Sequence, residues 1–94
     1  MEINIQSVKF DADRKLVEFV EKKMARLERF AERATSVNVV LSLDKDSEKG
    51  NKVAKVTLRI PGSDLVAEQR ARTFEEAVDL ALDAIKRQIE KHRE

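Results

Sequence analysis

Four stretches of the chain alternate hydrophobic and polar residues, and two longer stretches repeat hydrophobic residues every three or four positions. The alternating stretches are typical of strands with one buried face, and they lie at 2–10, 37–43, 52–60 and 65–72. The other two have the period of a helix that is buried along one side, and they cover 12–33 and the residues after Thr73. The predicted order of elements is therefore β-α-β-β-β-α.

The hydrophobic residues of each predicted element share one face. In the strands they include Ile3, Ile5, Val37, Val39, Leu41, Leu43, Ala54, Val56, Leu58 and Ile60, and in the helices Leu16, Val20, Met24, Leu27, Ala31, Phe74, Ala77, Val78, Ala81, Leu82, Ile85 and Ile89. Two helices packed on one face of a four-stranded sheet would bury all of these stripes. The other sheet face would stay polar and exposed, as antiparallel sheets tolerate. The sequence therefore predicts an α+β domain.

Local signals mark the helix starts and the turns. Asp11 or Asp13 is placed to cap the first helix, and Thr73 with Glu76 forms a capping box before the last one. The polar stretch 44–51 and the Pro-Gly stretch 61–64 are predicted turns between strands.

Composition narrows the class of protein. A chain of 94 residues is expected to form a single domain, 1–94. The absence of cysteine excludes disulfides and thiolate chemistry, and one histidine, His92, argues against a catalytic zinc site. No stretch is apolar enough to span a membrane and no signal peptide is present, so we expect a soluble cytoplasmic protein with no membrane partner.

The net charge is only +1, although 39% of the residues are charged. The positions of the charges therefore say more about a binding partner than their sum does. At about 100° per residue, cations gather on one side of the first helix. They are Lys15, Lys22, Arg26, Arg29 and Arg33, with Lys23 near the edge of the apolar stripe. Pairs such as Lys22–Arg26 place like charges one turn apart, which costs roughly a few tenths of a kcal/mol. The row favours an anionic partner, and the alternative is a solvated face held by ion pairs such as Glu18–Lys22.

Basic residues also flank the apolar stripe of the last helix. Arg87 and Lys91 lie on one flank, and Lys86 and Arg93 lie on the other. Cations near a helix C-terminus complement the helix dipole, so a structural role explains this pattern equally well. The nearby His92 is expected to be structural or incidental.

The exposed sheet face offers a further basic group. It consists of Lys55, Arg59, Arg70 and Arg72, with Glu68 among them. No aromatic residue is interleaved there, and the chain has no Tyr or Trp, so stacking on unpaired bases is poorly supported. Binding to the phosphates of folded RNA needs only placed cations and is easier to support.

Nothing in the sequence indicates catalysis. Asp44, Asp46 and Glu48 lie in one turn but lack the spacing of an EF-hand. Two glycines are too few for a phosphate-binding loop, and no serine has a histidine in a triad-like arrangement. We therefore expect no enzyme activity, no cofactor and no small-molecule substrate.

Four segments, in order along the chain, resemble one family. "INIQS" looks like its opening strand, "KMARLERF" (23–30) resembles its K-[apolar]-A-K-L-E-[KQ]-[aromatic] segment, and "VNVVLSLDK" (37–45) is similar to the strand that follows. "RQIEKH" (87–92) resembles its R-Q-L-x-K-H segment near the C-terminus. The family is that of the short ribosome hibernation-promoting factors, also called ribosome-associated inhibitors or sigma-54 modulation proteins.

The resemblance implies a fold like that of double-stranded RNA-binding domains. It also implies a ribosomal RNA partner, in the mRNA and tRNA channel of the small ribosomal subunit, and inhibition of translation in stationary phase or stress. The chain would be a short form, without the C-terminal dimerisation domain of longer members.

The resemblance also implies binding residues. By position, the family's RNA-contacting residues match Lys23, Arg26, Arg29, Arg87 and Lys91. Lys22, Arg33, Lys86 and Arg93 are added from their places on the helices, and both helices are expected to share one basic surface.

Two positions depart from the family pattern. Ala84 stands where the family usually has lysine, which shortens the basic flank of the last helix, and Glu75 stands where an aromatic residue is frequent. A redesigned scaffold of this fold without ribosome function, a generic double-stranded RNA-binding module and a protein-interaction domain remain alternatives.

Overall fold

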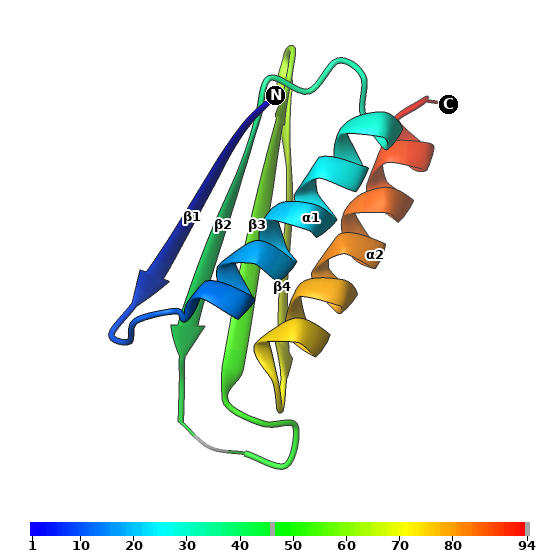
Figure 1. The fold of residues 1–94 in the computed structure, drawn as a ribbon. Coiled ribbons are helices and arrows are strands. Elements are labelled where there is room, and N and C mark those ends of the chain that lie inside the picture. Colours follow the sequence, from blue (N-terminus) through cyan, green and yellow to red (C-terminus); the bar gives the residue numbers. More distant parts are fainter. Residues whose placement is uncertain (46, 94) are drawn as a thin grey trace.

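The chain forms two layers, a four-stranded sheet and two helices that cover one face of it (Figure 1). The structure, a computed structural model, describes residues 1–45 and 47–93, and of Arg93 only the backbone. The elements are β1 (Glu2–Val8), α1 (Arg14–Phe30), β2 (Ser36–Leu43), β3 (Lys52–Ile60), β4 (Ser63–Ala71) and α2 (Phe74–Arg93). The predicted α+β class and the order β-α-β-β-β-α are both confirmed.

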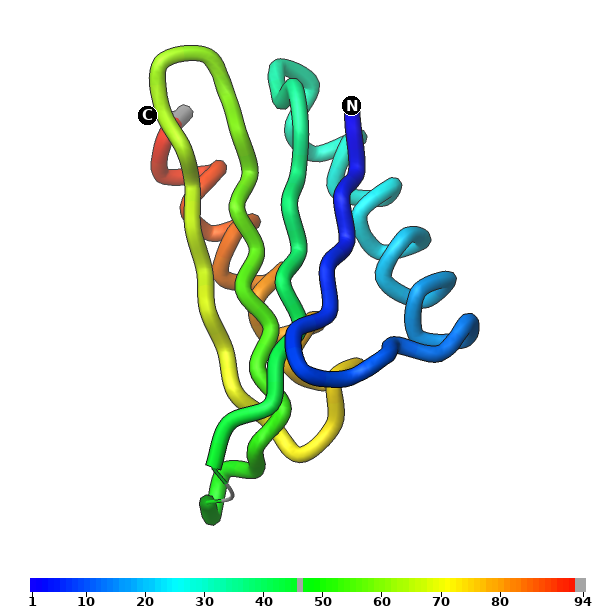
Figure 2. The backbone as a smooth tube through the Cα atoms, turned by 90° about the vertical axis from the view of Figure 1, so that its left-hand side faces the viewer, coloured from blue at the N-terminus to red at the C-terminus, as the bar shows by residue number. Residues whose placement is uncertain are grey.

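The sheet is mixed, whereas the polar outer face had suggested an antiparallel one. Its strands lie in the order β1-β2-β3-β4, with antiparallel pairing between β2, β3 and β4. β1 pairs with β2 in parallel, because α1 carries the chain back to the end at which β1 began. In Figure 2 the strands lie side by side in this order, and α1 lies past the β1 edge.

The first helix is shorter than the predicted 12–33. It begins after Asp13, whose side chain accepts a hydrogen bond of 2.8 Å from the Leu16 N–H. It ends at Phe30, and the backbone of the capping residue Ala31 leaves the helical region with φ −128° and ψ 73°. Arg33, which was expected on the helix, therefore lies in the loop that follows it.

The two sheet faces differ less sharply than the alternating pattern predicts. On the face toward the helices, Leu43 is 39% exposed because it lies at the end of β2. On the opposite face, Val53 is only 8% exposed, and its partner across the sheet is Arg70. The first strand ends at Val8 rather than at residue 10, because Lys9 takes a positive φ of 68°.

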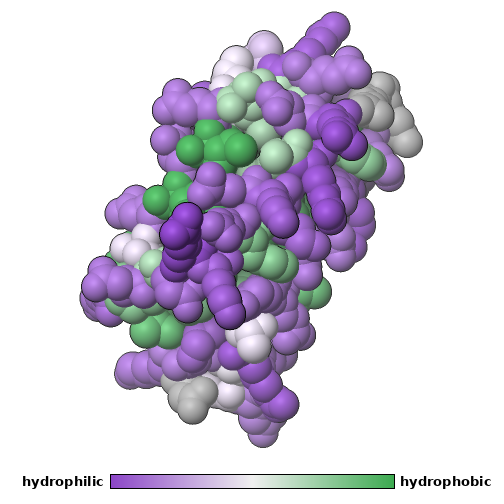
Figure 3. All heavy atoms as spheres, in the orientation of Figure 1, coloured by the Kyte–Doolittle hydropathy of each residue, from purple (hydrophilic) through white to green (hydrophobic). Residues whose placement is uncertain are grey.

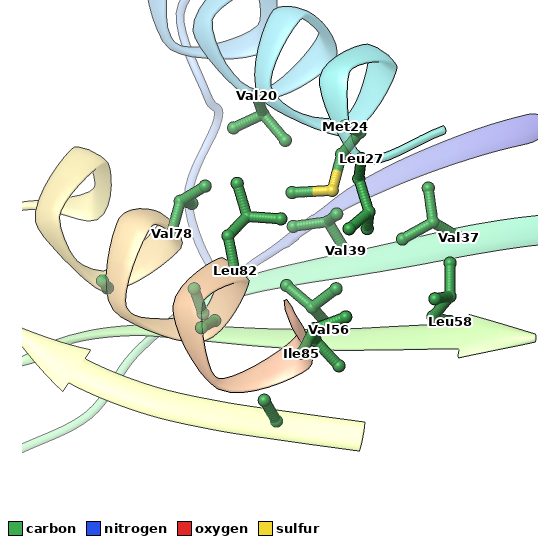
Figure 4. Close-up of a cluster of buried hydrophobic side chains, with 14 of the residues drawn as sticks. Val20, Met24, Leu27, Val37, Val39, Val56, Leu58, Val78, Leu82 and Ile85 are labelled. Atoms are coloured by element: carbon green, nitrogen blue, oxygen red, sulfur yellow. The ribbon is translucent and has the colours of Figure 1, made fainter. Parts of the chain in front are cut away.

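The core lies between the helices and the sheet. In Figure 4, side chains from both helices and from β2 and β3 point toward one another. Those that are fully buried include Val20, Met24, Leu27, Val37, Val39, Leu41, Val56, Leu58, Val78 and Ile85. Every buried side chain in the described part of the chain is apolar, and none is polar or charged.

Both helices run in the same direction, so their C-terminal ends lie at one end of the molecule (Figure 1). Thr73 begins the second helix by accepting a hydrogen bond of 3.1 Å from the Glu76 N–H, which is one half of the predicted capping box. The negative ends of the two helix dipoles therefore lie together, at the end where most of the predicted binding residues occur.

Candidate nucleic-acid interface

A row of cations lies on the solvent side of α1, because the buried stripe of the helix fixes how it is turned. Leu16 and Met24 are buried, and at about 100° per residue this directs Lys22, Arg26 and Arg29 to solvent. Within residues 1–45 and 47–93, these three cations make no ion pair. The row is therefore available to an external anion.

The ion pair expected of a merely solvated face is not formed. Glu18 pairs with Arg14 at 3.1 Å, one turn before it, and not with Lys22 one turn after it. On the other side of α1, Glu28 accepts from the amino group of Met1 at 2.8 Å. The carboxylates of α1 that form ion pairs thus pair with groups outside the cation row and leave it uncompensated.

Two of the predicted residues lie in the seam between the helices. Lys23 pairs with Asp79 of α2 at 3.0 Å, and its ammonium lies 5.3 Å from the Phe19 ring centre. Lys86 of α2 lies 5.5 Å from the ring centre of Phe30 on α1. These two lysines join the helices, and part of their charge is already engaged within the protein.

Arg87 and Lys91 lie on the other side of α2 from that seam. Asp79 and Lys86 contact α1, whereas Gln88 donates a hydrogen bond of 2.8 Å to the Val66 carbonyl at the sheet edge. These contacts fix the rotation of α2, and by helical phase Arg87 points to solvent and Lys91 leans toward β4. Both are exposed, and neither makes an ion pair with another described residue.

The helix layer is therefore basic on both sides of a mixed seam rather than uniformly basic. By the same helical phase, Asp79 lies on the side of α2 that turns toward α1, and Asp83 and Glu90 point outward between that side and Arg87. Figure 3 shows hydrophilic side chains over most of this side of the molecule, with smaller apolar areas between them. An anionic ligand would meet two groups of cations, one on each helix.

Arg33 lies at a hollow that sequence reasoning did not predict. The hollow has a volume of about 480 Å³, and its lining comes from the end of α1, the β3–β4 turn and the last turns of α2. The lining residues are Phe30, Ala31, Glu32, Arg33, Ile60, Pro61, Leu65, Ile89 and His92. Phe30 lies at the edge of the apolar stripe of α1, and this position is the sequence signal that could have indicated an aromatic surface here.

Two of the four cations on the sheet face form ion pairs, and Arg72 donates to the Glu48 carbonyl. Arg59 pairs with Asp64 at 3.5 Å, and Arg70 pairs with Asp44. Lys55 lies opposite Glu68 across the sheet. The hydrogen bond from the Lys45 backbone, and then the Arg70 guanidinium, lower the pKa of Asp44 below its usual value. This face is a weaker candidate than the helix layer.

The described residues of the turn that follows β2 do not form a cation site. Of the three carboxylates named in the sequence, Asp46 lies outside the described residues, and Asp44 is paired with Arg70. In the described part of the chain, no group of three or more His, Asp or Glu residues could hold a metal ion. None of its helices is long and apolar enough to cross a membrane.

The two departures from the family pattern lie in different settings. Ala84 is half-buried and packs at the margin of the core, so a lysine there would add its charge at the edge of α2. Glu75 is exposed in the first turn of α2, where an acidic side chain complements the helix dipole. Neither position disturbs the fold.

Comparison with known proteins gives one consistent family. Residues 3–94 match the model of the family described as "Sigma 54 modulation protein / S30EA ribosomal protein". A ribosome hibernation promoting factor from Azotobacter vinelandii is 35% identical over the whole chain, which covers 84% of that protein. One from Escherichia coli K12 is 31% identical, and the chain covers 95% of it.

Solved structures show the same fold. A ribosomal subunit interface protein from Coxiella burnetii has a TM-score of 0.87 with 22% identity, covering 99% of this chain and 98% of that one. The N-terminal domain of Protein Y from Thermus thermophilus has a TM-score of 0.81 with 26% identity, covering 98% and 99%. The arrangement of sheet and helices described above is thus shared with both of these proteins.

Proposed function

This chain belongs to the sigma 54 modulation protein / S30EA ribosomal protein family, and from that premise we propose that it is a ribosome hibernation factor. It binds the small ribosomal subunit in the channel that mRNA and tRNA occupy, and it blocks translation in stationary phase or stress. Residues 1–94 act as one ribosome-binding domain in the cytoplasm, and binding involves no chemical step.

The observation that carries the proposal is the set of uncompensated cations on the helix layer. Lys22, Arg26 and Arg29 on α1 make no ion pair with any described residue, although glutamates are abundant on the same helix. Unpaired like charges oppose folding slightly, and the phosphates of a bound RNA would neutralise them. Arg33, Arg87 and Lys91 extend this set at the C-terminal ends of the helices.

Lys23 and Lys86 have a second role in this proposal. Because each is held in the seam between the helices, it positions the two groups of cations relative to each other. Their contribution to phosphate binding is smaller than that of Arg26 or Arg29, since nearby groups already stabilise part of their charge.

A pair of charge reversals tests the proposal. Arg26→Glu with Arg29→Glu should abolish co-sedimentation with vacant small subunits at moderate salt, because two phosphate contacts become repulsive. The matched control is Lys55→Glu with Arg59→Glu on the sheet face, which changes the net charge equally and should leave binding intact. Circular dichroism of both variants checks that the fold is kept.

Experiments with competitors and with other RNA ligands show which results would contradict the proposal. tRNA should displace the protein if the binding site overlaps the tRNA sites. Equal affinity for any A-form duplex would instead favour a generic double-stranded RNA-binding module. If the wild-type chain does not sediment with small subunits even at low salt, the proposal is wrong and the fold serves as a scaffold.

A further inference from the structure

The hollow at the C-terminal ends of the helices combines two kinds of surface. Its deeper part is apolar, since Ala31, Leu65 and Ile89 are 7%, 8% and 7% exposed. Phe30 and Ile60 are half-buried and line it further out. Its polar lining comes from exposed Glu32, Arg33 and His92.

This combination selects for a particular chemistry. A hollow of about 480 Å³ with apolar side chains in part of its lining is large enough for a small ring system. Arg33 makes no ion pair within the described residues, so an anionic group beside the ring would gain a partner. A ligand with a flat, weakly polar ring next to a phosphate satisfies both parts, and a nucleotide is the common molecule of that kind.

We infer that this hollow takes one unstacked nucleobase of the bound RNA, with its phosphate on Arg33. The inference rests on the proposed function and adds to it, because backbone contacts alone carry no sequence information. The hollow adjoins the proposed interface directly, since Phe30 contacts Lys86 and Arg33 follows Arg29 by one turn's length of chain. Lys86 and Arg29 can therefore reach the phosphates on either side of the nucleotide whose base enters the hollow.

The hollow contains an aromatic residue, whereas the basic sheet face has none. Single-stranded RNA is usually held by bases that stack on aromatic rings or pack on apolar side chains, and no Tyr or Trp exists in this chain. Phe30 is the aromatic residue of the hollow, and Ile60 with Pro61 forms the opposite wall on the β3–β4 turn. A base between them would pack on apolar groups and present its polar edge to Glu32 or His92.

Nuclear magnetic resonance of side-chain methyl groups tests the inference without a ribosome. Adenosine 5′-monophosphate is added to the full chain, and the methyl signals of Ile60, Leu65 and Ile89 are followed. They should shift with this nucleotide in the millimolar range, whereas ribose 5-phosphate and inorganic phosphate should leave them in place. No shift with the nucleotide, or equal shifts with ribose 5-phosphate, would overturn the inference.

Ile60→Glu places a charge in the hollow from a half-exposed position, and Val66→Glu makes the same kind of change on the sheet face, where Val66 is 44% exposed. Ile60→Glu should remove the response of Leu65 and Ile89 to the nucleotide. It should also weaken small-subunit binding by about tenfold, the effect of losing one stacked base. Val66→Glu should behave as wild type.

The two proposals fail in different experiments. If Ile60→Glu leaves small-subunit binding unchanged, the nucleobase site is wrong. This holds even if Arg26→Glu with Arg29→Glu abolishes binding. Conversely, a nucleotide response in a chain that never sediments with ribosomes would remove the proposed function, and it would leave a base-binding hollow without its ribosomal setting.

Discussion

Gly50 is a residue of the turn after β2 that lies directly against the end of β4. Its φ is +95°, and a Cβ placed on it would collide with the backbone of Ala71. Arg70 holds the same turn by donating hydrogen bonds to the carbonyls of Gly50 and Lys45. Glycine is therefore required twice here, for its positive φ and for the close approach of two backbones.

Replacing Gly50 should cost far more stability than replacing the other glycine. Gly50→Ala is expected to lower the free energy of unfolding by about 2 to 4 kcal/mol, because strain and a backbone collision add. Gly62 also has a positive φ, of 82°, but a Cβ added there would meet nothing within 4 Å. Gly62→Ala should therefore cost only about 1 kcal/mol. Urea unfolding followed by circular dichroism measures both, and equal losses would contradict the role of the Ala71 contact.

At the same scale, the sequence predicts which way a side chain points better than it predicts which residue that side chain contacts. The exposure of Arg26 and Arg29 follows from helical phase, which the buried stripe alone determines. The pairing of Lys23 with Asp79 joins two helices that are distant in the sequence, so no local pattern could predict it. The Phe30 hollow was missed for the same reason, because three separate segments build it.

Between elements, an ion pair and a cation–aromatic contact join α1 and α2 across their seam. The side chains of Lys23 and Asp79 are 28% and 49% exposed, so water screens their attraction. The apolar stripes beneath them supply most of the free energy that holds the helices to the sheet. The ion pair therefore sets the orientation of the helices more than their stability.

A double-mutant cycle on this seam measures that balance. Lys23→Ala and Asp79→Ala should each destabilise the protein slightly, with a coupling of roughly 0.2 to 1 kcal/mol. If the proposed function holds, Lys23→Ala should also weaken small-subunit binding less than Arg26→Ala does. A coupling near zero in urea unfolding would mean that the contact does not hold the helices together.

Element boundaries show where local signals suffice. Asp13 was one of two predicted caps for α1, and the structure selects it over Asp11. The capping signal of Thr73 likewise placed the start of α2 correctly. The parallel pairing of β1 was not predicted, because pairing depends on the path of the whole helix between the strands.

On the scale of the whole molecule, a net charge of +1 conceals two unlike surfaces. On the sheet face Arg59 and Arg70 pair with carboxylates, whereas most cations of the helix layer are left without them among the described residues. Both helix C-termini lie at the end where Arg33, Arg87 and Lys91 occur, and their dipoles favour cations there. The helix layer is thus the face on which an anionic partner gains most.

Binding to ribosomes should depend steeply on salt. If Lys22, Arg26, Arg29, Arg33, Arg87 and Lys91 each meet one phosphate, the logarithm of the association constant should fall against the logarithm of salt concentration with a slope of about −5. Arg29→Ala should reduce the magnitude of that slope by about 1, since one counterion fewer is released. Fluorescence anisotropy of labelled protein across a salt series gives both slopes. A slope near zero would exclude phosphate binding as the main source of affinity.

The all-apolar core separates what makes this protein fold from what makes it recognise a partner. No charged or polar side chain of the described residues is buried, so none of the proposed contacts depends on a polar group in the interior. Exposed side chains can then be exchanged at a typical cost within about 0.5 kcal/mol. Over evolutionary time, such a chain can change its ligand, or lose it, without passing through an unstable intermediate. Relatives with the same architecture are therefore free to have diverged in what they bind.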